Sequence, residues 1–307
     1  MEILNIRNLN KKFNNIDVLK HINLTLKEGE ILSILGESGC GKSTLLRIIA
    51  GLETKDSGDI ELKKDCGVAM MFQNYALFPH LNVNKNIEFA LSKMPKNERD
   101  IEIESLLEKF KIKELKNKMC DQISGGQAQR VAFARAVANK EKLLLLDEPF
   151  ANLDHNLRHT LRSELKQMIK QNGLSAIMVT HDKEDAFMLS DRIALIKNGI
   201  ILDIGTPKEL YFNPSSFEVA KFLGEMNSVA GYNIEVLPDE FKQWLKNKRY
   251  MFRPEQIISG NKFEANVLSY RFLGAFYELE LEFMNVKFKS IINSNIEISD
   301  KFGFDLN

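Results

Sequence analysis

The chain has 307 residues, enough for one large domain or two ordinary ones, and its 44% hydrophobic and 27% charged residues are typical of a globular protein. Lysine plus arginine equals aspartate plus glutamate at 42 each, which argues against a uniformly basic surface for nucleic acid. No apolar run approaches the roughly 18 residues that span a bilayer, and three cysteines without a CxxC pair indicate free thiols in a reducing cytosol.

The N-terminal segment predicts strands joined by turns. The runs "EILNIRNL" and "HINLTL" alternate roughly with period two, and "KEGEILSILG" leads from a glycine turn into an apolar strand that ends at Gly36. The first residues contain no apolar core followed by a cleavage site, so we expect no signal peptide. A helix begins within "GKSTLLRIIAGL" and is expected to end at Gly51.

Helices and strands alternate through the middle of the chain. Ile103, Leu106, Leu107 and Phe110 share one helical face, and "KLLLLLDEP" suits a short strand buried on both sides. A further helix runs to Gly173, and "LSAIMVT" is another buried strand. "RIALIKNGIILDIG" predicts a hairpin around an Asn-Gly turn, and "TPKE" predicts a capping box with proline at the first helical position.

The pattern changes after Ser228, where short alternating strands replace helices. In "YELELEF", Tyr277, Leu279, Leu281 and Phe283 face one way and the three glutamates the other. We therefore predict two domains. Residues 1–224 form an α/β domain with a largely parallel sheet, and residues 225–307 form a small, barrel-like β domain.

The stretch "GESGCGKST" matches G-x-x-x-x-G-K-[ST] between a predicted strand and a helix, the arrangement of a phosphate-binding loop. Glycines let successive N–H groups turn toward phosphate oxygens, and the helix N-terminus adds about half a positive charge. Lys42 is expected to reach the β- and γ-phosphates, and Ser43 to bind Mg²⁺. The predicted nucleotide contacts of this loop are Gly36, Glu37, Ser38, Gly39, Cys40, Gly41, Lys42, Ser43 and Thr44. A chance glycine-rich turn is the alternative, and for Cys40 a small side chain at a variable position is favoured over redox control.

Two adjacent carboxylates end the run "LLLLDEP". Asp147 ends the buried strand, where it can hold Mg²⁺ through water, and Glu148 projects differently, so it can reach an attacking water as general base. A solvated turn is the alternative interpretation, but it is disfavoured beside a complete phosphate-binding loop.

A second glycine pair opens the helix "QAQRVAFARAVAN". Taken alone, Ser124, Gly125 and Gly126 indicate no more than a helix N-cap with a flexible lead-in. The chain already carries a phosphate-binding loop, however, so a serine hydroxyl and glycine amides at a second helix start have no ligand within the same chain. We infer that two copies pack head to tail, each closing its Ser124–Gln127 segment over the ATP of the other.

Five motifs in this order resemble those of the ATP-binding subunits of ABC transporters: "GESGCGKST", the glutamine of "MMFQNYALFPHLNV", "ISGGQAQRVAFARA", "LLLLDEPFANLD" and the histidine of "MVTHD". The resemblance covers residues 1–224 and implies a RecA-like P-loop domain with an inserted helical subdomain at about 74–138. It implies that Phe13 stacks on adenine and that Gln73 senses Mg²⁺ and links to a membrane partner. It also implies that Asp154 communicates across the dimer, and that His181 contacts the γ-phosphate and orients the water. Plain core, N-cap and turn roles are the alternatives for Phe13, Asp154 and His181.

The importer branch is the most similar part of that family. The spacing between Lys42 and Asp147 leaves no room for the long coiled coil of repair ATPases, one nucleotide motif set excludes the tandem translation type, and fused membrane helices are absent. "MFRPEQI" and "YRFLGAFYELELEF" resemble the OB-type regulatory domain of importer ATPases for sugars, polyamines, sulfate, molybdate and ferric iron, with "RPEQ" closest to ferric iron.

The resemblance implies an ATPase that uses ATP and Mg²⁺ to energise solute import, with ferric iron the expected solute and a polyamine, sulfate, molybdate or a sugar the alternatives. Its expected partners are a second copy of itself, two permease subunits and, indirectly, a solute-binding protein, at the cytoplasmic face of the inner membrane. Tyr75, Leu77 and Phe78 are expected to line the groove for a permease helix. The runner-up is an ATP-switched cytosolic regulator that is not coupled to transport.

Overall fold

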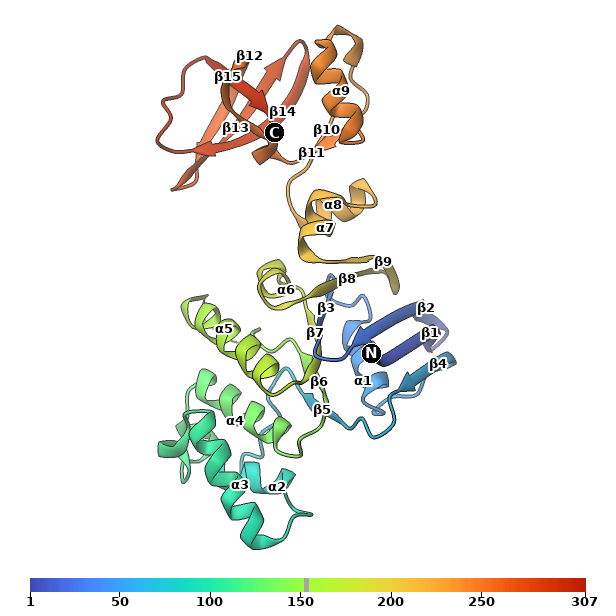
Figure 1. Cartoon of the computed structure of the whole chain (residues 1–307), viewed down its shortest axis with the longest axis vertical. Helices are drawn as coiled ribbons and strands as arrows, with labels where there is room; N and C mark the ends of the chain where they lie inside the picture. The colour runs from blue at the N-terminus through green and yellow to red at the C-terminus, as the bar shows by residue number, and fades with distance from the viewer. Residues whose placement is uncertain (152–154) are drawn as a thin grey trace. The chain divides into compact units, whose positions relative to one another are not determined.

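The computed structural model describes residues 1–151 and 155–307. The chain divides into two compact units, Met1–Pro207 and Lys208–Asn307 (Figure 1). This division assigns residues 208–224 to the second unit, whereas our predicted domains, 1–224 and 225–307, include them in the first; those domain limits stay a prediction. Among the described residues, no helix is long and apolar enough to cross a membrane.

An antiparallel sheet opens the first unit. Its strands lie in the order β2-β1-β4 and are β1 (Glu2–Phe13), β2 (Ile16–Lys27) and β4 (Ser57–Leu62). Asn14 and Asn15 connect β1 to β2 and both have positive φ, at 47° and 64°. Asparagine tolerates this left-handed conformation, which matches the twist of a two-residue hairpin. The predicted N-terminal strands are therefore confirmed.

A six-stranded sheet in the order β5-β6-β7-β3-β8-β9 forms the centre of this unit. The strands are β3 (Ile31–Leu35), β5 (Val68–Met71), β6 (Leu143–Asp147), β7 (Ser175–Thr180), β8 (Arg192–Lys197) and β9 (Ile200–Gly205). All neighbours pair in parallel except the hairpin β8–β9. The predicted parallel sheet and the Asn-Gly hairpin are confirmed.

Helices cover the sheet and fill the insertion between β5 and β6. They are α1 (Lys42–Ile49), α2 (Val83–Ala90), α3 (Lys96–Lys109), α4 (Gly125–Val137), α5 (His155–Gln171) and α6 (Lys183–Leu189), with short 3-10 turns η1 (Lys113–Leu115) and η2 (Cys120–Gln122). Strand β6 separates two cores. Leu143 and Leu145 pack with α1 and the antiparallel sheet, and Leu144 and Leu146 pack with α2–α5. Burial on both faces explains the unbroken leucine run.

The second unit combines three short α-helices and two 3-10 turns with a β region. Its elements are α7 (Pro207–Phe212), α8 (Phe217–Leu223), β10 (Asn227–Ser228), η3 (Ile234–Val236), α9 (Asp239–Asn247), β11 (Met251–Phe252), η4 (Pro254–Gln256), β12 (Ile257–Phe272), β13 (Phe276–Phe283), β14 (Val286–Asn293) and β15 (Lys301–Leu306). The main sheet is antiparallel, in the order β14-β13-β12-β15, which confirms a C-terminal β region.

Alternation along β13 sets the buried face of that sheet. Leu279, Leu281 and Phe283 are buried, as the sequence predicts, and Glu280 is exposed. Helix α9 covers this core with Phe241, whose ring lies 5.9 Å from that of Trp244. The sequence analysis missed α9, although apolar residues at positions 241, 244 and 245 follow the i, i+3, i+4 spacing of an amphipathic helix.

Candidate active site

The polar groups of the candidate site lie where three parallel strands end. Gly36 follows β3, Asp147 is the last residue of β6, and His181 follows β7. The backbone ties these ends together, since Gly36 N donates to Thr180 O at 3.4 Å and Glu148 N donates to Val179 O at 3.0 Å. Because β3, β6 and β7 are parallel neighbours, segments far apart in the sequence meet at one edge of the sheet.

The loop between β3 and α1 presents backbone donors. Gly39 and Gly41 have φ of 82° and 103°, which L side chains rarely adopt, and Gly41 is the N-cap of α1 without a side-chain cap. A Cβ atom on Gly41 would lie 2.8 Å from Val18 O, so glycine is required there on steric grounds as well. The first turn of α1 is therefore left with N–H groups available to an anion.

Lys42 is held at the mouth of this loop. Its ammonium donates to Gly36 O and Glu37 O, both at 2.8 Å, and the residue is only 5% exposed. An ammonium has three N–H donors, so these two bonds fix its position and leave a third donor. Glu37, Ser38 and Gly39 are exposed, whereas Cys40 is buried in the core beneath the loop, where burial raises the pKa of its thiol. A raised thiol pKa disfavours redox reactivity at Cys40.

Ser43 and Asp147 form a pair of oxygen donors. Ser43 Oγ donates to Asp147 Oδ1 at 2.9 Å. Burial raises the pKa of the Asp147 carboxyl, and the neighbouring charge of Glu148 adds to the shift. No group of three or more histidine, cysteine, aspartate or glutamate side chains suited to a metal occurs in the part of the chain that the structure describes. One hydroxyl and one carboxylate fit Mg²⁺, which commonly takes one or two protein oxygens and completes its shell with water and phosphate.

Glu148 contacts other side chains than Asp147 does. Its backbone is left-handed, with φ of 45°, a conformation that costs a non-glycine residue about 1–2 kcal/mol. Gln73 Nε2 donates to Glu148 Oε2 at 3.3 Å, and His181 Nδ1 lies 3.2 Å from Glu148 Oε1. The structure thus brings together the three predicted catalytic side chains that follow β5, β6 and β7. The Glu148 carboxylate contacts an amide and an imidazole, and these surroundings suit a general base.

Ser124 caps its own helix. Its Oγ accepts from Gln127 N at 3.3 Å and Gln127 Oε1 accepts from Ser124 N at 3.0 Å, a reciprocal capping box at the start of α4. Within the described residues, no hydrogen bond joins Ser124–Gln127 to the Gly36–Thr44 loop. Gly125 is exposed and Gly126 is buried.

Phe13 ends β1 and is 42% exposed, and Lys11 Nζ lies 4.7 Å from its ring centroid. An exposed ring backed by a cation is available for stacking on a planar ligand. The predicted residue Asp154 lies outside the described residues.

Two contacts of α4 were missed by the sequence analysis. Arg135 donates to Ala76 O at 2.7 Å and to Tyr75 O at 2.8 Å, so it holds the loop that follows Gln73. Gln129 Nε2 donates to Pro149 O at 2.9 Å, next to Glu148. The available signal was an arginine and a glutamine at core-facing positions of a helix, where unpaired polar groups are costly.

The predicted role of Tyr75 in a groove is wrong. Left-handed backbone at Tyr75 and Ala76, with φ of 62° and 45°, turns the tyrosine into the core, where it is 8% exposed. Its hydroxyl is buried without a hydrogen-bond partner among the described residues. Leu77 and Phe78 are half-buried, and the Phe78 ring packs at 4.6 Å on the exposed ring of Phe89. Phe89, and not Tyr75, is the exposed aromatic residue beside Phe78.

The chain is similar to known proteins in sequence and in fold. The ABC transporter family profile matches residues 19–151. The chain is 38% identical to the Fe(3+) ions import ATP-binding protein of Haemophilus influenzae (strain Rd), over 97% of this chain and 93% of that one. It is 45% identical to the spermidine/putrescine import ATP-binding protein of Thermotoga maritima, over 78% of this chain and 67% of that one. A solved dimeric ATP-binding cassette in a post-hydrolysis state with ADP and Pi superposes with a TM-score of 0.59 at 31% identity, covering 66% of this chain and 98% of that one.

Proposed function

The chain belongs to the ABC transporter family as an ATP-binding subunit and is an ATPase that drives transport, and from that premise we propose that it energises the import of ferric iron. The observation that carries the enzymatic part is the Glu148 carboxylate, held between Gln73 and His181 next to the Ser43–Asp147 pair. The Glu148 carboxylate can orient a water and accept its proton. Neighbouring donor groups can stabilise charge on a phosphate oxygen.

We assign the residues by their positions. The Gly36–Thr44 loop holds the ATP phosphates through its amides and Lys42, and Phe13 stacks on the adenine. Ser43, Asp147 and Gln73 would hold Mg²⁺, which would neutralise phosphate charge. Glu148 takes the proton of the attacking water, and His181 orients that water and contacts the γ-phosphate. The Ser124–Gln127 segment serves the ATP of the partner copy, with Asp154 communicating across the dimer.

The proposed assembly is a homodimer bound to two permease subunits at the cytoplasmic face of the cell membrane, supplied by a solute-binding protein on the other side. The dimeric cassette with ADP and Pi supports pairing of two copies. The Phe78–Phe89 surface, next to the loop held by Arg135, is the proposed docking place for a permease helix.

The choice of ferric iron over polyamine rests on the RPEQ stretch at residues 253–256. The extent of the similarity does not separate the two solutes. The ferric-iron relative is 38% identical over 97% of this chain, and a spermidine/putrescine import ATP-binding protein is 40% identical over 90% of it.

Reconstitution tests this choice. We would purify the chain with its permease in proteoliposomes and measure ATP hydrolysis with the solute-binding protein loaded with ferric iron or with spermidine. Stimulation by the iron-loaded protein alone is the expected result. Stimulation by spermidine alone would reassign the solute and keep the ATPase mechanism, while hydrolysis indifferent to any loaded binding protein would contradict coupled import.

A further inference from the structure

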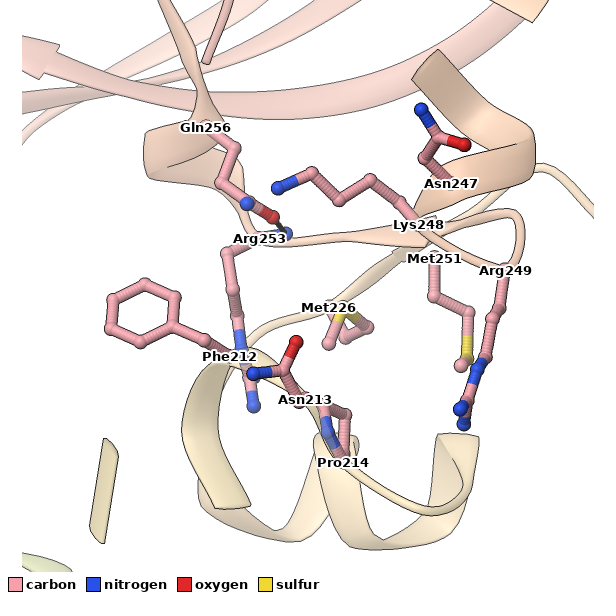
Figure 2. Close-up of a pocket in the computed structure, with 10 residues that line it drawn as sticks. All are labelled: Phe212, Asn213, Pro214, Met226, Asn247, Lys248, Arg249, Met251, Arg253 and Gln256. Carbon is pink, nitrogen blue, oxygen red and sulfur yellow. Dashed lines mark hydrogen bonds between the residues drawn. The ribbon is translucent and has the colours of Figure 1, made fainter. Parts of the chain in front are cut away.

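The C-terminal unit contains a pocket of about 150 Å³ with a positively charged lining (Figure 2). Its wall comes from the turn after α7, from Met226, and from the segment that runs from the end of α9 to η4. Three cations, Lys248, Arg249 and Arg253, line it, and no aspartate or glutamate is present among the described residues that form its wall. A small cavity lined by cations without carboxylates favours an anion.

Arg253 is the best-fixed of these cations. The residue is 1% exposed, its Nε donates to Tyr211 O at 3.1 Å and its Nη1 donates to Glu225 O at 2.9 Å. The guanidinium also lies 4.1 Å from the centroid of the Tyr211 ring. Figure 2 follows the side chain from the β11–η4 segment toward Phe212 and Asn213. Position and orientation of the guanidinium are therefore set before any ligand arrives.

One nitrogen of this guanidinium lacks a partner. Arg253 Nη2 is buried and donates to no acceptor among the described residues. Burial also lowers the pKa of Arg253. A buried charged donor without an acceptor is unfavourable, so an acceptor of opposite charge has a strong reason to bind there.

The other two cations are not neutralised by the protein. Neither Lys248 nor Arg249 forms a side-chain ion pair within the described residues, and Lys248 Nζ lies 5.8 Å from the centroid of the Trp244 ring. Nearby carboxylates are engaged elsewhere, because Glu255 accepts from Tyr211 OH at 2.7 Å and Glu225 pairs with Lys289 at 3.5 Å. Lys248 and Arg249 are therefore unpaired by carboxylates, whereas the charge of Arg253 also interacts with Glu255, which does not line the pocket.

We propose that this pocket binds a small oxyanion, which accepts from Arg253 Nη2 and is attracted by Lys248 and Arg249. A sulfate, a phosphate or the carboxylate of a small metabolite has the required chemistry, and the volume admits a ligand of a few heavy atoms. The bound anion connects the turn after α7 to the α9–η4 segment within the C-terminal unit. This is a ligand site separate from the nucleotide site and independent of the transported solute.

Trp244 provides a local reporter. It is the only tryptophan of the chain, and it shares α9 and a cation contact with Lys248. We would titrate the full chain with sodium sulfate, phosphate or acetate at constant ionic strength, with excess ADP so that the Gly36–Thr44 loop does not compete for the anion. A saturable change in Trp244 fluorescence is expected with at least one of them. Saturation by sulfate or phosphate alone identifies a tetrahedral oxyanion, and saturation by acetate alone identifies a carboxylate.

Two variants locate the binding. The double variant Lys248→Met with Arg249→Met is expected to weaken the apparent affinity by about tenfold or more, because charge-assisted contacts are lost. The control Lys246→Met removes an exposed lysine of α9 that does not line the pocket and is expected to bind like the parent protein. Absence of saturation with all three anions, an unchanged affinity in the double variant, or an equal loss in the control would overturn the proposal. Thermal melts confirm that each variant is folded.

Discussion

The N-termini of α1 and α4, both in the first unit, differ in whether a side chain of the protein caps their free N–H groups. Helix α1 follows Gly41, which has no side chain to offer, so the first turn is left to a ligand. Helix α4 follows Ser124, and the reciprocal bonds between Ser124 and Gln127 satisfy two donors from within the chain. The first turn of α1 is therefore open to an anion, whereas the first turn of α4 is already capped from within the chain. This suits a primary phosphate site and a second segment that closes over the phosphate of another copy.

The largest effect is expected from Glu148→Gln. The amide cannot accept the proton of water, so hydrolysis should fall about 10²–10⁴-fold while ATP binding persists. Phosphate release and size-exclusion chromatography with saturating ATP measure the two properties, and the variant should accumulate as a dimer. Glu114→Gln, an exposed carboxylate of the helical insertion, is the matched control. A variant that remains monomeric with ATP would contradict the role given to Ser124.

Lys42→Ala tests the proposed phosphate site at the start of α1. Loss of one charge-assisted contact of about 1.5–3 kcal/mol should weaken ATP binding by roughly ten- to a hundredfold. Equilibrium titration with a fluorescent ATP analogue measures the change, with Lys64→Ala, an exposed lysine, as control. Unaltered affinity would remove Lys42 from the phosphate site.

Ser124→Ala tests the proposed role of the α4 N-terminus, and Ser216→Ala is its matched control. Both serines are N-caps that accept from the third residue of their helix, at 3.3 and 3.2 Å. Each substitution should therefore lower the free energy of unfolding by about 1 kcal/mol in denaturant titrations. Only Ser124→Ala should also reduce ATP-dependent dimerisation and hydrolysis, by about tenfold for a lost hydrogen bond to a charged group. Equal hydrolysis by the two variants means that Ser124 is a cap and nothing more.

Mixing variants sharpens the assignment to two chains. In a heterodimer of Lys42→Ala with Ser124→Ala, one composite site carries both defects and the other carries neither. A mixture that exchanges subunits should regain roughly a quarter of the parent activity if the two sites act independently. Activity no greater than the average of the separate variants would indicate that both segments serve one site in one chain.

The smallest effect is expected from Tyr75→Phe. The buried hydroxyl has no partner among the described residues, so its removal should leave the free energy of unfolding unchanged or raise it by up to about 1 kcal/mol. Urea unfolding of the isolated chain measures this, and hydrolysis should be retained. A clear loss of stability would reveal an acceptor for the hydroxyl.

The sequence was informative where a residue type has few physical alternatives. The leucine run of β6 predicts burial on both faces, and the glycines at 39 and 41 predict the positive φ that the loop adopts. Neighbouring strands in a parallel sheet then fix which motif ends meet, so the contact of Gln73, Glu148 and His181 follows from their order.

Other features depend on backbone conformations that no local pattern announces. The left-handed turn at Tyr75 reverses the direction of its side chain, so an aromatic residue expected at the surface is in the core. The partners of Arg135 and Arg253 are backbone carbonyls, which exist at every position and carry no sequence signal. Helix α9 was not predicted for a different reason. It is a short amphipathic helix of 9 residues, and the alternating strand patterns that follow it dominate this part of the sequence.

The two hydrogen bonds that Lys42 donates to backbone carbonyls have a kinetic consequence. They keep the loop in a single shape, so its ordering entropy is lost when the polypeptide folds and not when the nucleotide arrives. Association should then be limited by diffusion and charge attraction, with little heat capacity change from chain ordering. We therefore expect ADP release to need no refolding of the loop.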